Sequence, residues 1–557
     1  IMSISKGIAL ITGSAQGIGR GIALRLAKDG FDIALNDVPS KSDQLRAVAE
    51  DINKLDRKAH IIHADVTVEE QVKGMVQDVT HHFGGLDVMV ANAGIAQELV
   101  PLISTELDVW ERVMAVNARG AFLCYRYAAA QMIKQGRGGR LIAASSVAGK
   151  MGHPLNSAYT ASKFAVRGLT QTAALELGRY GITVNSYAPG VIQTPMSGAL
   201  MTYRCLARFY DTSDSKTIAK RPVKHNGQPE DIAAIVSYLA SKEAQFITGK
   251  LSTYILSAQG IGRAISLRLA KDGFDAALND VNPRLLMSIF KGVALVTGSA
   301  QGIGHAIALR LARDGFDVAL NDLASKSAQL HNVAKDIGSI GRKTCLAVAD
   351  VSDEEQVRGM VQHVANELGG LDVMVANAGI EQNICLMTSD LWEKVMAVNA
   401  RGPFLCYKHA ATQMIKQGRG GRLIAASSVA GKTGTPLISA YCASKFAVRG
   451  LTQTAALELA RYDITANSYA PGLIRTAMGT SNAALAALAS TNSELVELMK
   501  NSLNSAIKRE GQPEEVAGIV SYLASKEAQF VTGQCLNLKV FMGLQQRAHD
   551  ARLQANA

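Results

Sequence analysis

The stretch ALITGSAQGIGRGIALRLAKDGFDIALND, residues 9–37, determines how the chain folds. A short apolar run leads into a glycine-rich loop, the loop opens an amphipathic helix, and a second apolar run follows and ends at Asp37. Apolar runs and amphipathic helices go on alternating as far as Gly190. Short apolar strands separated by helices are typical of a parallel sheet that is covered on both faces. We therefore predict an α/β fold with a doubly wound parallel sheet.

The same stretch occurs a second time, as ALVTGSAQGIGHAIALRLARDGFDVALND at residues 294–322. Two later segments are repeated without a change, QMIKQGRGGRLIAASSVAG at 131–149 and 413–431, and ASKFAVRGLTQTAALEL at 161–177 and 443–459. A repeat of this length is a duplicated domain rather than a solenoid unit. We therefore expect two Rossmann domains in tandem, copy 1 over residues 1–255 and copy 2 over residues 289–557.

A partial third copy, SAQGIGRAISLRLAKDGFDAALNDV at residues 257–281, lies between the two domains. It lacks the strand and the Thr-Gly pair that precede the loop in the full copies. One loop, one helix and one strand cannot bury a core alone. We therefore interpret residues 256–288 as a linker left by the duplication rather than as a third nucleotide site.

The composition limits the classes of protein to consider. Apolar residues make up 48% of the 557 residues and charged residues 19%, which allows a large buried core and excludes wholesale disorder. No apolar run reaches the ~18 residues of a membrane helix, so we predict no membrane span. The seven cysteines are scattered, without a CxxC pair or a Cys/His cluster, which favours a cytoplasmic protein with reduced thiols and no metal site. The net charge of +11 is dispersed, which indicates a basic enzyme surface and argues against nucleic acid as a partner.

The loop from Thr12 to Gly19, TGSAQGIG, has the spacing of a phosphate-binding turn. Its glycines let the backbone approach a pyrophosphate, which then lies at the N-terminus of the following helix. We predict that this loop binds a dinucleotide in both copies. The residues concerned are Gly13, Gln16, Gly17, Ile18 and Gly19, and their counterparts Gly298, Gln301, Gly302, Ile303 and Gly304.

Asp37 ends the second predicted strand, and Asp322 is its counterpart in copy 2. A carboxylate at this place accepts hydrogen bonds from a ribose and repels a 2′-phosphate. Gln16 has no Arg beside it and Val38 follows Asp37, so we expect no basic group that would receive a 2′-phosphate. NAD is therefore the favoured cofactor, and NADP is left as the alternative.

Ser146 ends another predicted strand, and Tyr159 and Lys163 stand four residues apart on the helix that follows. Side chains with this spacing project from one face of a helix. A neighbouring ammonium stabilises a phenolate, so we expect Lys163 to lower the pKa of Tyr159 and to let it exchange a proton near neutral pH. The same set recurs in copy 2, as Ser428, Tyr441 and Lys445.

With these motifs the chain resembles the short-chain dehydrogenases/reductases over nearly the whole of both copies. The resemblance rests on the glycine loop, the Ser-Tyr-Lys set, Asn92-Ala93-Gly94, Asn117 within VNARG, and Asn185 followed by Pro189-Gly190 and Thr194. It implies that each copy transfers a hydride between a nicotinamide cofactor and a small ketone or secondary alcohol. Within the family, residues 162–190 look most like the acetoin/diacetyl reductases, which are butanediol dehydrogenases.

The resemblance also implies roles for single residues. Tyr159 would be the general acid/base, Lys163 would lower its pKa and hold the nicotinamide ribose, and Ser146 would orient the carbonyl. Asn117 would support a proton-relay water. The remaining cofactor residues of copy 1 would be Asp65 and Val66 at the adenine, Ile192 and Thr194 at the carboxamide, and Asn92, Gly94 and Pro189 elsewhere in the groove. Copy 2 matches at Asn399, Ser428, Tyr441 and Lys445 for catalysis, and at Asp350, Val351, Asn377, Gly379, Pro471, Ile474 and Thr476 for the cofactor.

The ends of the copies depart from the family pattern. Members usually close the sheet with a strand that ends in Asp-Gly-Gly, whereas copy 1 runs through ITGKLSTYILSAQG and copy 2 through VTGQCLNLKVFMGL. The alternative function is therefore a nucleotide-binding pseudoenzyme, or a misjoined tandem gene product without turnover.

Two further expectations concern assembly and substrate. Family members pair through helices that correspond to residues 108–135 and 158–180, so we expect an intramolecular pseudo-dimer of the two copies. The segments expected to form lids over the substrate, 197–224 and 479–510, differ most between the copies, because the first is basic and the second is neutral. We therefore expect copy 2 to act on small neutral substrates, and copy 1 either to tolerate anionic ones or to have low activity.

Overall fold

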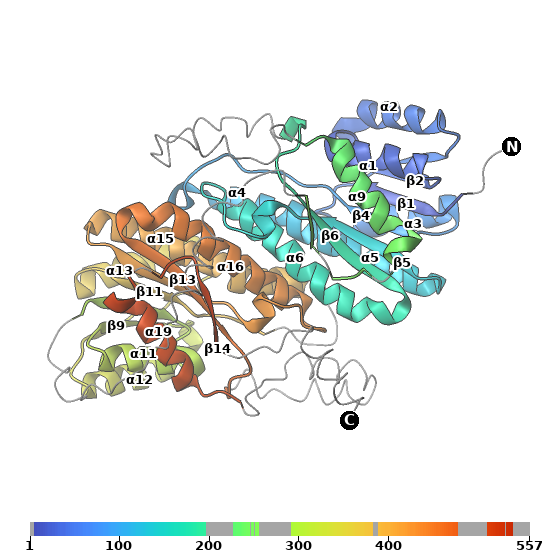
Figure 1. The fold of residues 1–557 in the computed structure, drawn as a ribbon. Helices are drawn as coiled ribbons and strands as arrows, with labels where there is room; N and C mark the ends of the chain where they lie inside the picture. Colours follow the sequence, from blue (N-terminus) through green and yellow to red (C-terminus); the bar gives the residue numbers. More distant parts are fainter. Residues whose placement is uncertain are drawn as a thin grey trace, which may run out of the picture.

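The computed structural model contains two open parallel sheets, one in each copy, and each sheet has seven strands (Figure 1). The structure describes residues 5–196, 227–245, 247–249, 251–254, 291–381, 388–476, 510–529 and 531–538. The predicted linker at 256–288 and the predicted lid at 197–224 lie outside these residues, as does all of the lid at 479–510 except Glu510. The domain boundaries proposed above therefore stay a prediction.

The sheet of copy 1 has the strand order β3-β2-β1-β4-β5-β6-β7, and the neighbouring strands are parallel. Its strands are β1 (Ile8–Thr12), β2 (Asp32–Asp37), β3 (Ala59–His63), β4 (Val88–Ala91), β5 (Gly139–Ala144), β6 (Ile182–Pro189) and β7 (Leu251–Tyr254). The order reverses between β1 and β4, since the chain builds outward to β3 and then returns to the other side of β1. Such a reversal opens a crevice at the carboxyl ends of the strands, where ligands bind.

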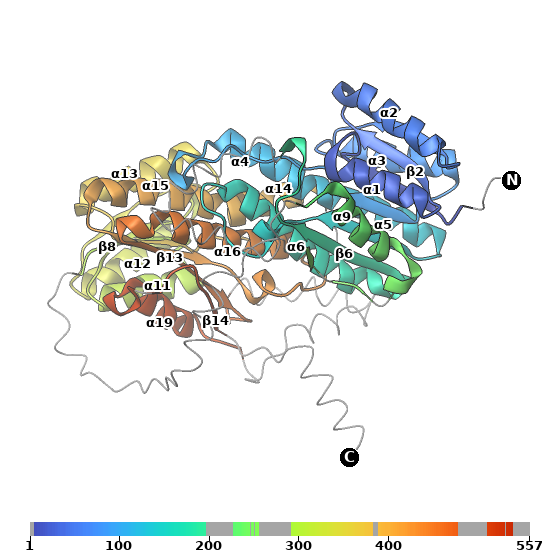
Figure 2. The same cartoon turned by 45° about the horizontal axis from the view of Figure 1, so that its top comes forward.

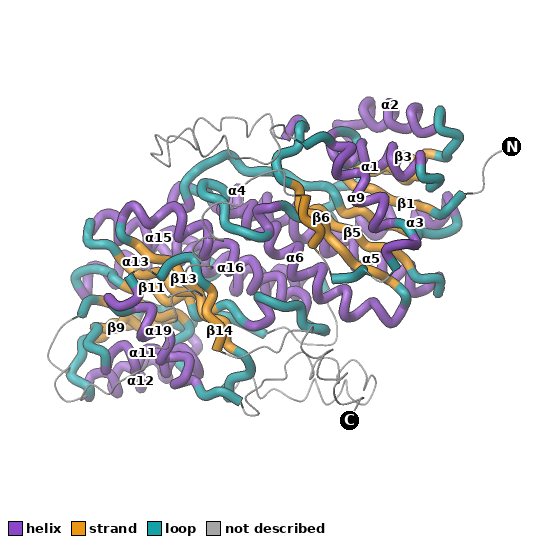
Figure 3. Tube along the Cα trace, in the orientation of Figure 1, coloured by secondary structure: helices purple, strands orange, loops and turns teal. Residues whose placement is uncertain are grey.

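Helices cover both faces of this sheet (Figure 3). On one face lie α1 (Gly17–Lys28), α2 (Ser42–Asn53) and α9 (Pro229–Ala240). On the other face lie α3 (Glu69–Phe83), α4 (Leu107–Met114), α5 (Gly120–Gln135) and α6 (Ser157–Leu177). Each helix turns an apolar stripe to the sheet, as Ile22 and Leu26 of α1 do, and both side chains are fully buried.

Copy 2 repeats the architecture with the order β10-β9-β8-β11-β12-β13-β14. Its strands are β8 (Val293–Thr297), β9 (Asp317–Asn321), β10 (Thr344–Leu346), β11 (Val373–Ala376), β12 (Gly421–Ala426), β13 (Ile464–Pro471) and β14 (Cys535–Leu538). Its helices are α11 (Gly302–Arg313), α12 (Ser327–Ser339), α13 (Glu354–Leu368), α14 (Ser389–Met396), α15 (Gly402–Gln417), α16 (Ser439–Leu459) and α19 (Pro513–Ala524). The predicted tandem of two doubly wound sheets is confirmed.

Two details refine the predicted elements. The long helix expected over 108–135 is divided by a π-helical segment, Ala115–Arg119, between α4 and α5. The last strand forms in both copies although the Asp-Gly-Gly turn is missing, because β7 pairs with β6 and β14 pairs with β13. The carboxyl end of β6, where a cofactor groove would lie, is therefore flanked by a strand on each side.

The two copies are in contact through α6 and α16, which lie side by side in both views (Figures 1 and 2). A Cβ on Gly168 would lie 2.8 Å from the ring of Phe446, so a glycine is needed for this close approach. Aromatic rings stack reciprocally between the copies, at 4.4 Å between centroids for Trp110 on Phe404 and 4.6 Å for Phe122 on Trp392. One continuous buried cluster includes apolar residues of both copies.

Candidate active site

The glycine-rich loop of copy 1 lies at the carboxyl end of β1, where the chain turns into α1. Gly13 and Gly17 have φ angles of 64° and 53°, in the left-handed region that favours glycine. A Cβ on Gly19 would lie 2.0 Å from the carbonyl oxygen of Gly13, so only glycine lets the helix start this close to the loop. No side chain caps the start of α1 at Gln16, and uncapped N–H groups at a helix start attract an anion.

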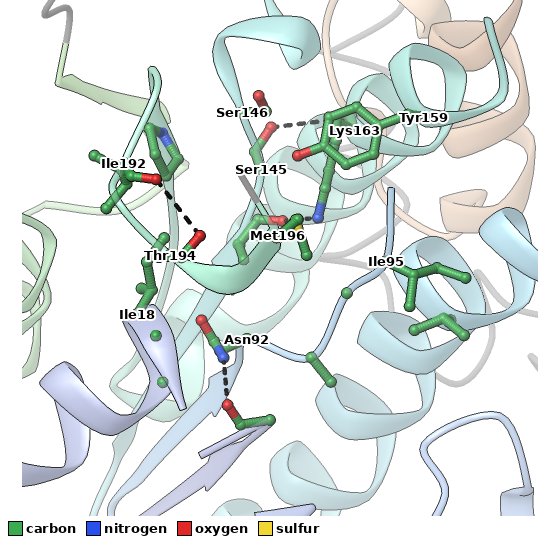
Figure 4. A pocket seen from close by; sticks show the side chains of 18 of the residues that line it. Ile18, Asn92, Ile95, Ser145, Ser146, Tyr159, Lys163, Ile192, Thr194 and Met196 are labelled. Atoms are coloured by element: carbon green, nitrogen blue, oxygen red, sulfur yellow. Dashed lines mark hydrogen bonds between the residues drawn. The ribbon is translucent and has the colours of Figure 1, made fainter. Parts of the chain in front are cut away.

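Asn92 ties the glycine loop to the strands beside it (Figure 4). Its Nδ2 donates to the carbonyl oxygen of Thr12 at 2.9 Å and to that of Gly13 at 3.2 Å. Its Oδ1 accepts a hydrogen bond from the hydroxyl of Tyr187, in β6, at 2.8 Å. Asn92 therefore fixes the loop from the ends of β4 and β6, and a substitution here would loosen the turn.

A cavity of about 540 Å³ lies along the carboxyl ends of the strands of copy 1 (Figure 4). The predicted catalytic residues Ser146, Tyr159 and Lys163 line it. So do all the cofactor residues predicted for copy 1, which are Gly13, Gln16, Gly17, Ile18, Gly19, Asp37, Asp65, Val66, Asn92, Gly94, Pro189, Ile192 and Thr194. The predicted nucleotide residues and the predicted catalytic residues thus share one site.

Ser146 follows β5 and lies beside Tyr159 (Figure 4), and its hydrogen bonding acts on the pKa of the phenol. Its Oγ also accepts the backbone N–H of Ala148 at 3.1 Å, which fixes the hydroxyl at the start of a short turn. The Nζ of Lys163 donates to the carbonyl oxygen of Ala144 at 2.9 Å and lies 5.4 Å from the centroid of the Tyr159 ring. Backbone groups therefore fix the hydroxyl and the ammonium within the small region that also contains the phenol.

The pKa of Tyr159 is not lowered as we expected. Burial raises the pKa of Tyr159, and the hydrogen bond with Ser146 opposes this rise. Burial also lowers the pKa of Lys163, to about 8. The physical reason is that both groups lose contact with water, which disfavours each charged form, while the ammonium hydrogen-bonds Ala144 rather than the phenol. Ser146 is thus the group that favours the phenolate in this structure.

Asn117 lies in the π-helical segment and does not line the described cavity. Its Oδ1 accepts the N–H of Ile95 at 2.8 Å. Its Nδ2 donates to the carbonyl oxygen of Ile95 at 2.9 Å and to the hydroxyl of Ser162 at 3.1 Å. Both amide hydrogens are therefore in use, so a water relay at Asn117 would depend on its main chain rather than on its side chain.

Copy 2 repeats this geometry. The Nζ of Lys445 donates to the carbonyl oxygen of Ala426 at 2.9 Å and lies 5.5 Å from the centroid of the Tyr441 ring. Ser428 is hydrogen-bonded to Tyr441, and Asn399 pairs with the backbone of Ile380 as Asn117 does with Ile95. Burial raises the pKa of Tyr441 to about 12 and lowers that of Lys445 to about 8.

The glycine loop of copy 2 has the same constraints as that of copy 1. Gly298 and Gly302 have φ angles of 63° and 58°. A Cβ on Gly304 would lie 2.1 Å from the carbonyl oxygen of Gly298. Asn377 donates to the carbonyl oxygen of Thr297 at 2.9 Å, as Asn92 does in copy 1.

Both copies match known family profiles. Residues 13–253 match the profile described as enoyl-(acyl carrier protein) reductase, and residues 292–485 match the one described as short chain dehydrogenase. The short-chain dehydrogenase/reductase eriH of Hericium erinaceus is 50% identical over 248 residues, which are 44% of this chain and 95% of that protein. The chain belongs to the short-chain dehydrogenase/reductase family.

Further relatives are as long as one copy of this short-chain dehydrogenase/reductase. The 3-oxoacyl-[acyl-carrier-protein] reductase FabG of Staphylococcus epidermidis is 40% identical over 242 residues, 43% of this chain and 94% of its own. Among solved structures, the acetoin dehydrogenase YohF of Salmonella typhimurium is 33% identical, with a TM-score of 0.40, and covers 46% of this chain and 98% of its own. Family members are oxidoreductases that use a nicotinamide cofactor, NAD(H) or NADP(H).

One expectation about the cofactor groove of this short-chain dehydrogenase/reductase is wrong, because a basic group does lie on the same cavity as Asp37. Lys41 lines the cavity, since the short 3-10 turn Pro39–Lys41 folds back after β2. In copy 2 the Nζ of Lys326, its counterpart, donates to Gln301 at 3.4 Å. The signal in the sequence is a lysine four residues after the strand-end aspartate in both copies.

Sequence reasoning also missed two polar side chains of the cavity. His153 and Asn156 lie between Ser146 and α6 and line the same cavity as Tyr159. Within the described structure, the Nε2 of His153 and the Oδ1 of Asn156 are buried without a hydrogen-bond partner. Burial lowers the pKa of His153, which favours the neutral imidazole. Copy 2 has Thr435 and Ile438 at these positions, so the two cavities differ in chemistry.

Three findings bear on metals, membranes and thiols. Within the described ranges, no group of three or more His, Cys, Asp or Glu side chains is placed to hold a metal ion. None of the helices in those ranges combines the length and apolar character of a membrane span. The described cysteines, Cys124, Cys345, Cys406, Cys442 and Cys535, are free thiols.

Proposed function

We propose that each copy transfers a hydride between NAD(H) and a small ketone or secondary alcohol. The observation that carries this proposal is a single cavity lined both by the glycine loop and by Ser146, Tyr159 and Lys163 (Figure 4). A phosphate-binding turn can hold the dinucleotide, and a phenol can give the carbonyl oxygen its proton, which are two functions that nicotinamide-dependent carbonyl reduction needs. The near-identical arrangement in copy 2 supports the same reaction there.

The groove of copy 1 fits a nicotinamide dinucleotide. Gly13 and Gly17 have left-handed φ angles and Gly19 packs against the carbonyl of Gly13, so the backbone turns tightly and a pyrophosphate can lie at the N–H groups that start α1. The carboxylate of Asp37 would accept hydrogen bonds from the adenosine ribose hydroxyls. It is held in place by the backbone N–H of Ala15, at 3.2 Å from Oδ2, and by that of Val38, at 3.0 Å from Oδ1. Lys41 would receive a 2′-phosphate only through a long, flexible side chain, so NAD(H) is the favoured cofactor and NADP(H) the alternative. Bound nicotinamide would supply or accept the hydride.

Tyr159 is the proposed general acid/base. During reduction its hydroxyl would give its proton to the carbonyl oxygen of the substrate, and during oxidation the phenolate would take the proton back. Ser146, already hydrogen-bonded to the phenol, would hold the same substrate oxygen. With a pKa of about 8, Lys163 is mostly charged at neutral pH, and its ammonium, which donates to Ala144, would hold the nicotinamide ribose. Asn117 positions Ile95 beside this set.

His153 and Asn156 indicate the substrate class of copy 1. The amide oxygen would accept a hydrogen bond from a hydroxyl next to the reacting carbonyl, and the imidazole nitrogen, as N–H, would donate to a second oxygen there. Acetoin and diacetyl carry such an oxygen, so we propose that copy 1 acts on acetoin- or diacetyl-like substrates. Copy 2 has Thr435 and Ile438 instead, and burial, together with the negative charge of Glu381, raises the pKa of its tyrosine. We therefore propose that copy 2 prefers ketones without the second oxygen.

We also propose that the two copies act as an intramolecular pseudo-dimer in a cytoplasmic protein whose partners are small molecules. The reciprocal ring stacks of Trp110 on Phe404 and of Phe122 on Trp392 support the pairing. Arg119 with Glu393 and Arg401 with Glu111 form two matching ion pairs, at 2.6 and 2.8 Å, between the copies. Free thiols support a reducing compartment.

The test is turnover by the purified chain with NADH and NADPH against acetoin, diacetyl and 2-butanone. Tyr159→Phe should silence copy 1 only and Tyr441→Phe copy 2 only. The double variant should bind NADH without turnover. Turnover by the double variant would remove tyrosine from the mechanism. Nucleotide binding by the unaltered chain without turnover of any carbonyl would instead favour the pseudoenzyme.

A further inference from the structure

The segment between the Ser146 turn and α6 forms part of the wall of the cavity in copy 1. We name residues 150–156 wall loop 1 and their counterparts 432–438 wall loop 2. Wall loop 1 carries His153 and Asn156, which line the cavity. Leu155 has a φ angle of 63°, and Leu437 in wall loop 2 has one of 71°. This conformation is unfavourable for a branched apolar residue, so it persists only where the surroundings hold it.

Side chains of copy 2 hold wall loop 1. The Oε1 of Glu458 accepts the backbone N–H of Leu155 at 2.7 Å. Its Oε2 accepts the backbone N–H of Leu102 at 2.6 Å, on the segment that leads into α4. The Oε1 of Gln453 accepts the N–H of Gly152 at 2.9 Å. Glu458 and Gln453 both belong to α16, the helix that carries Tyr441 of the other site.

The contact is reciprocal. The Oε1 of Glu176 accepts the backbone N–H of Leu437 at 2.8 Å, and the Oε1 of Gln171 accepts that of Gly434 at 3.0 Å. Glu176 and Gln171 both belong to α6, which carries Tyr159. Each helix that carries a catalytic tyrosine for its own copy therefore also supports the cavity wall of the opposite copy.

We propose that each catalytic site is completed by the opposite copy, with Glu458 as the positioning residue for copy 1 and Glu176 as the positioning residue for copy 2. The inference rests on the proposed function and on the proposed pairing of the copies. Glu458 does not line the cavity itself. It acts through wall loop 1, by setting where His153 and Asn156 meet the substrate.

The position of Glu458 needs a group with two acceptor oxygens. Each of its two oxygens accepts a backbone N–H, and an amide in its place would turn an NH₂ group toward one of these donors. Glu458 is only 3% exposed, so water cannot replace a lost acceptor. Glu458→Gln should therefore leave a buried backbone N–H of Leu102 or Leu155 without an acceptor.

The test uses chains in which only one copy is active. In the Tyr441→Phe chain, Glu458→Gln should raise the KM of copy 1 for acetoin by about 10-fold, with the KM for NADH unchanged. Glu176→Gln should leave copy 1 unaffected there, and in the Tyr159→Phe chain it should instead raise the carbonyl KM of copy 2. Glu111→Gln, which removes another carboxylate between the copies, is the matched control and should change neither KM. Effects confined to the copy that carries the substitution, or no effect in a chain that melts normally, would overturn the proposal.

Two further measurements keep the proposal testable. If Glu458→Gln fails to fold, Gln453→Ala should raise the same acetoin KM to a smaller extent, because it removes only the Gly152 contact. Hydrogen exchange at the amides of Leu102 and Leu155 requires no turnover, and Glu458→Gln should accelerate it. Faster exchange in a chain without any turnover would support the wall-loop contact and place the failure in the proposed function. Unchanged exchange would overturn the positioning role.

Discussion

Glu458 should make the stability of the protein depend on pH between 4.5 and about 7. Burial raises the pKa of this carboxyl from 4.5 to about 7, against the effect of the N–H groups of Leu102 and Leu155 and of the charge of Arg461. Within that window the folded state holds a proton that the unfolded state has lost. The free energy of unfolding therefore falls as the pH rises through the window and is flat on either side of it.

The size of the effect follows from the two pKa values. A difference between 4.5 and about 7 corresponds to about 3 kcal/mol, at ~1.4 kcal/mol for each pH unit. Because Glu458 is 3% exposed, solvent does not reduce this value. Glu458→Gln removes the titrating group, so the pH dependence of the variant should be shallower by about 3 kcal/mol. Urea unfolding of both proteins at a series of pH values across the window measures the difference.

The control is Glu111→Gln, since Glu111 is 41% exposed and paired with Arg401 at the surface. Exposed ion pairs contribute little to stability, so this variant should keep the pH dependence of the unaltered protein. Burial also raises the pKa of Glu176 to about 7, so this group titrates in the same window. The double variant Glu176→Gln/Glu458→Gln should therefore show a still shallower pH dependence of the free energy of unfolding. Parallel pH curves for the unaltered protein and Glu458→Gln would refute the reasoning.

Three other predictions concern the loop, the contact between the copies and the cofactor. Gly19→Ala should abolish NADH binding by copy 1 in calorimetric titration, because its Cβ would lie 2.0 Å from a backbone oxygen, whereas Gly74→Ala, with no atom within 4 Å, should leave binding intact. Trp392→Ala should lower the free energy of unfolding in urea by about 3–5 kcal/mol, because its ring is 2% exposed and stacked between the copies. Asp37→Ala should shift the kcat/KM ratio of copy 1 toward NADPH and Lys41→Ala away from it, each by about 10-fold.

Local patterns were sufficient to predict the two sheets and the cofactor residues that line the cavity of copy 1. The glycine loop, the strand ends at Asp37 and Ser146, and the spacing of Tyr159 and Lys163 all depend on residues close in sequence. The carboxyl ends of parallel strands lie at one edge of a sheet, so these separate motifs had to meet there. This is why all the predicted cofactor residues of copy 1 line a single cavity.

The features that sequence reasoning missed depend on contacts between distant segments. The pKa of Tyr159 is set by burial and by the hydrogen bond with Ser146, and neither is visible in a Tyr-x-x-x-Lys spacing. The role of Asn117 depends on a π-helical segment, which has no residue pattern of its own here. Glu458 lies in a stretch with the pattern of an ordinary helix. Its partners Leu102 and Leu155 belong to the other copy, so the local pattern does not predict the contact.

The stacked rings of Trp110 and Phe404 join two domains that one polypeptide already connects. Two separate chains that pair through such a surface come apart on dilution, whereas linked domains meet at an effective concentration that dilution does not change. The ratio of the two sites is likewise fixed at one to one in every molecule. A wall loop supported from the opposite copy therefore keeps its support at any protein concentration, and the specific activity should stay constant down to the lowest enzyme concentration that an assay can follow.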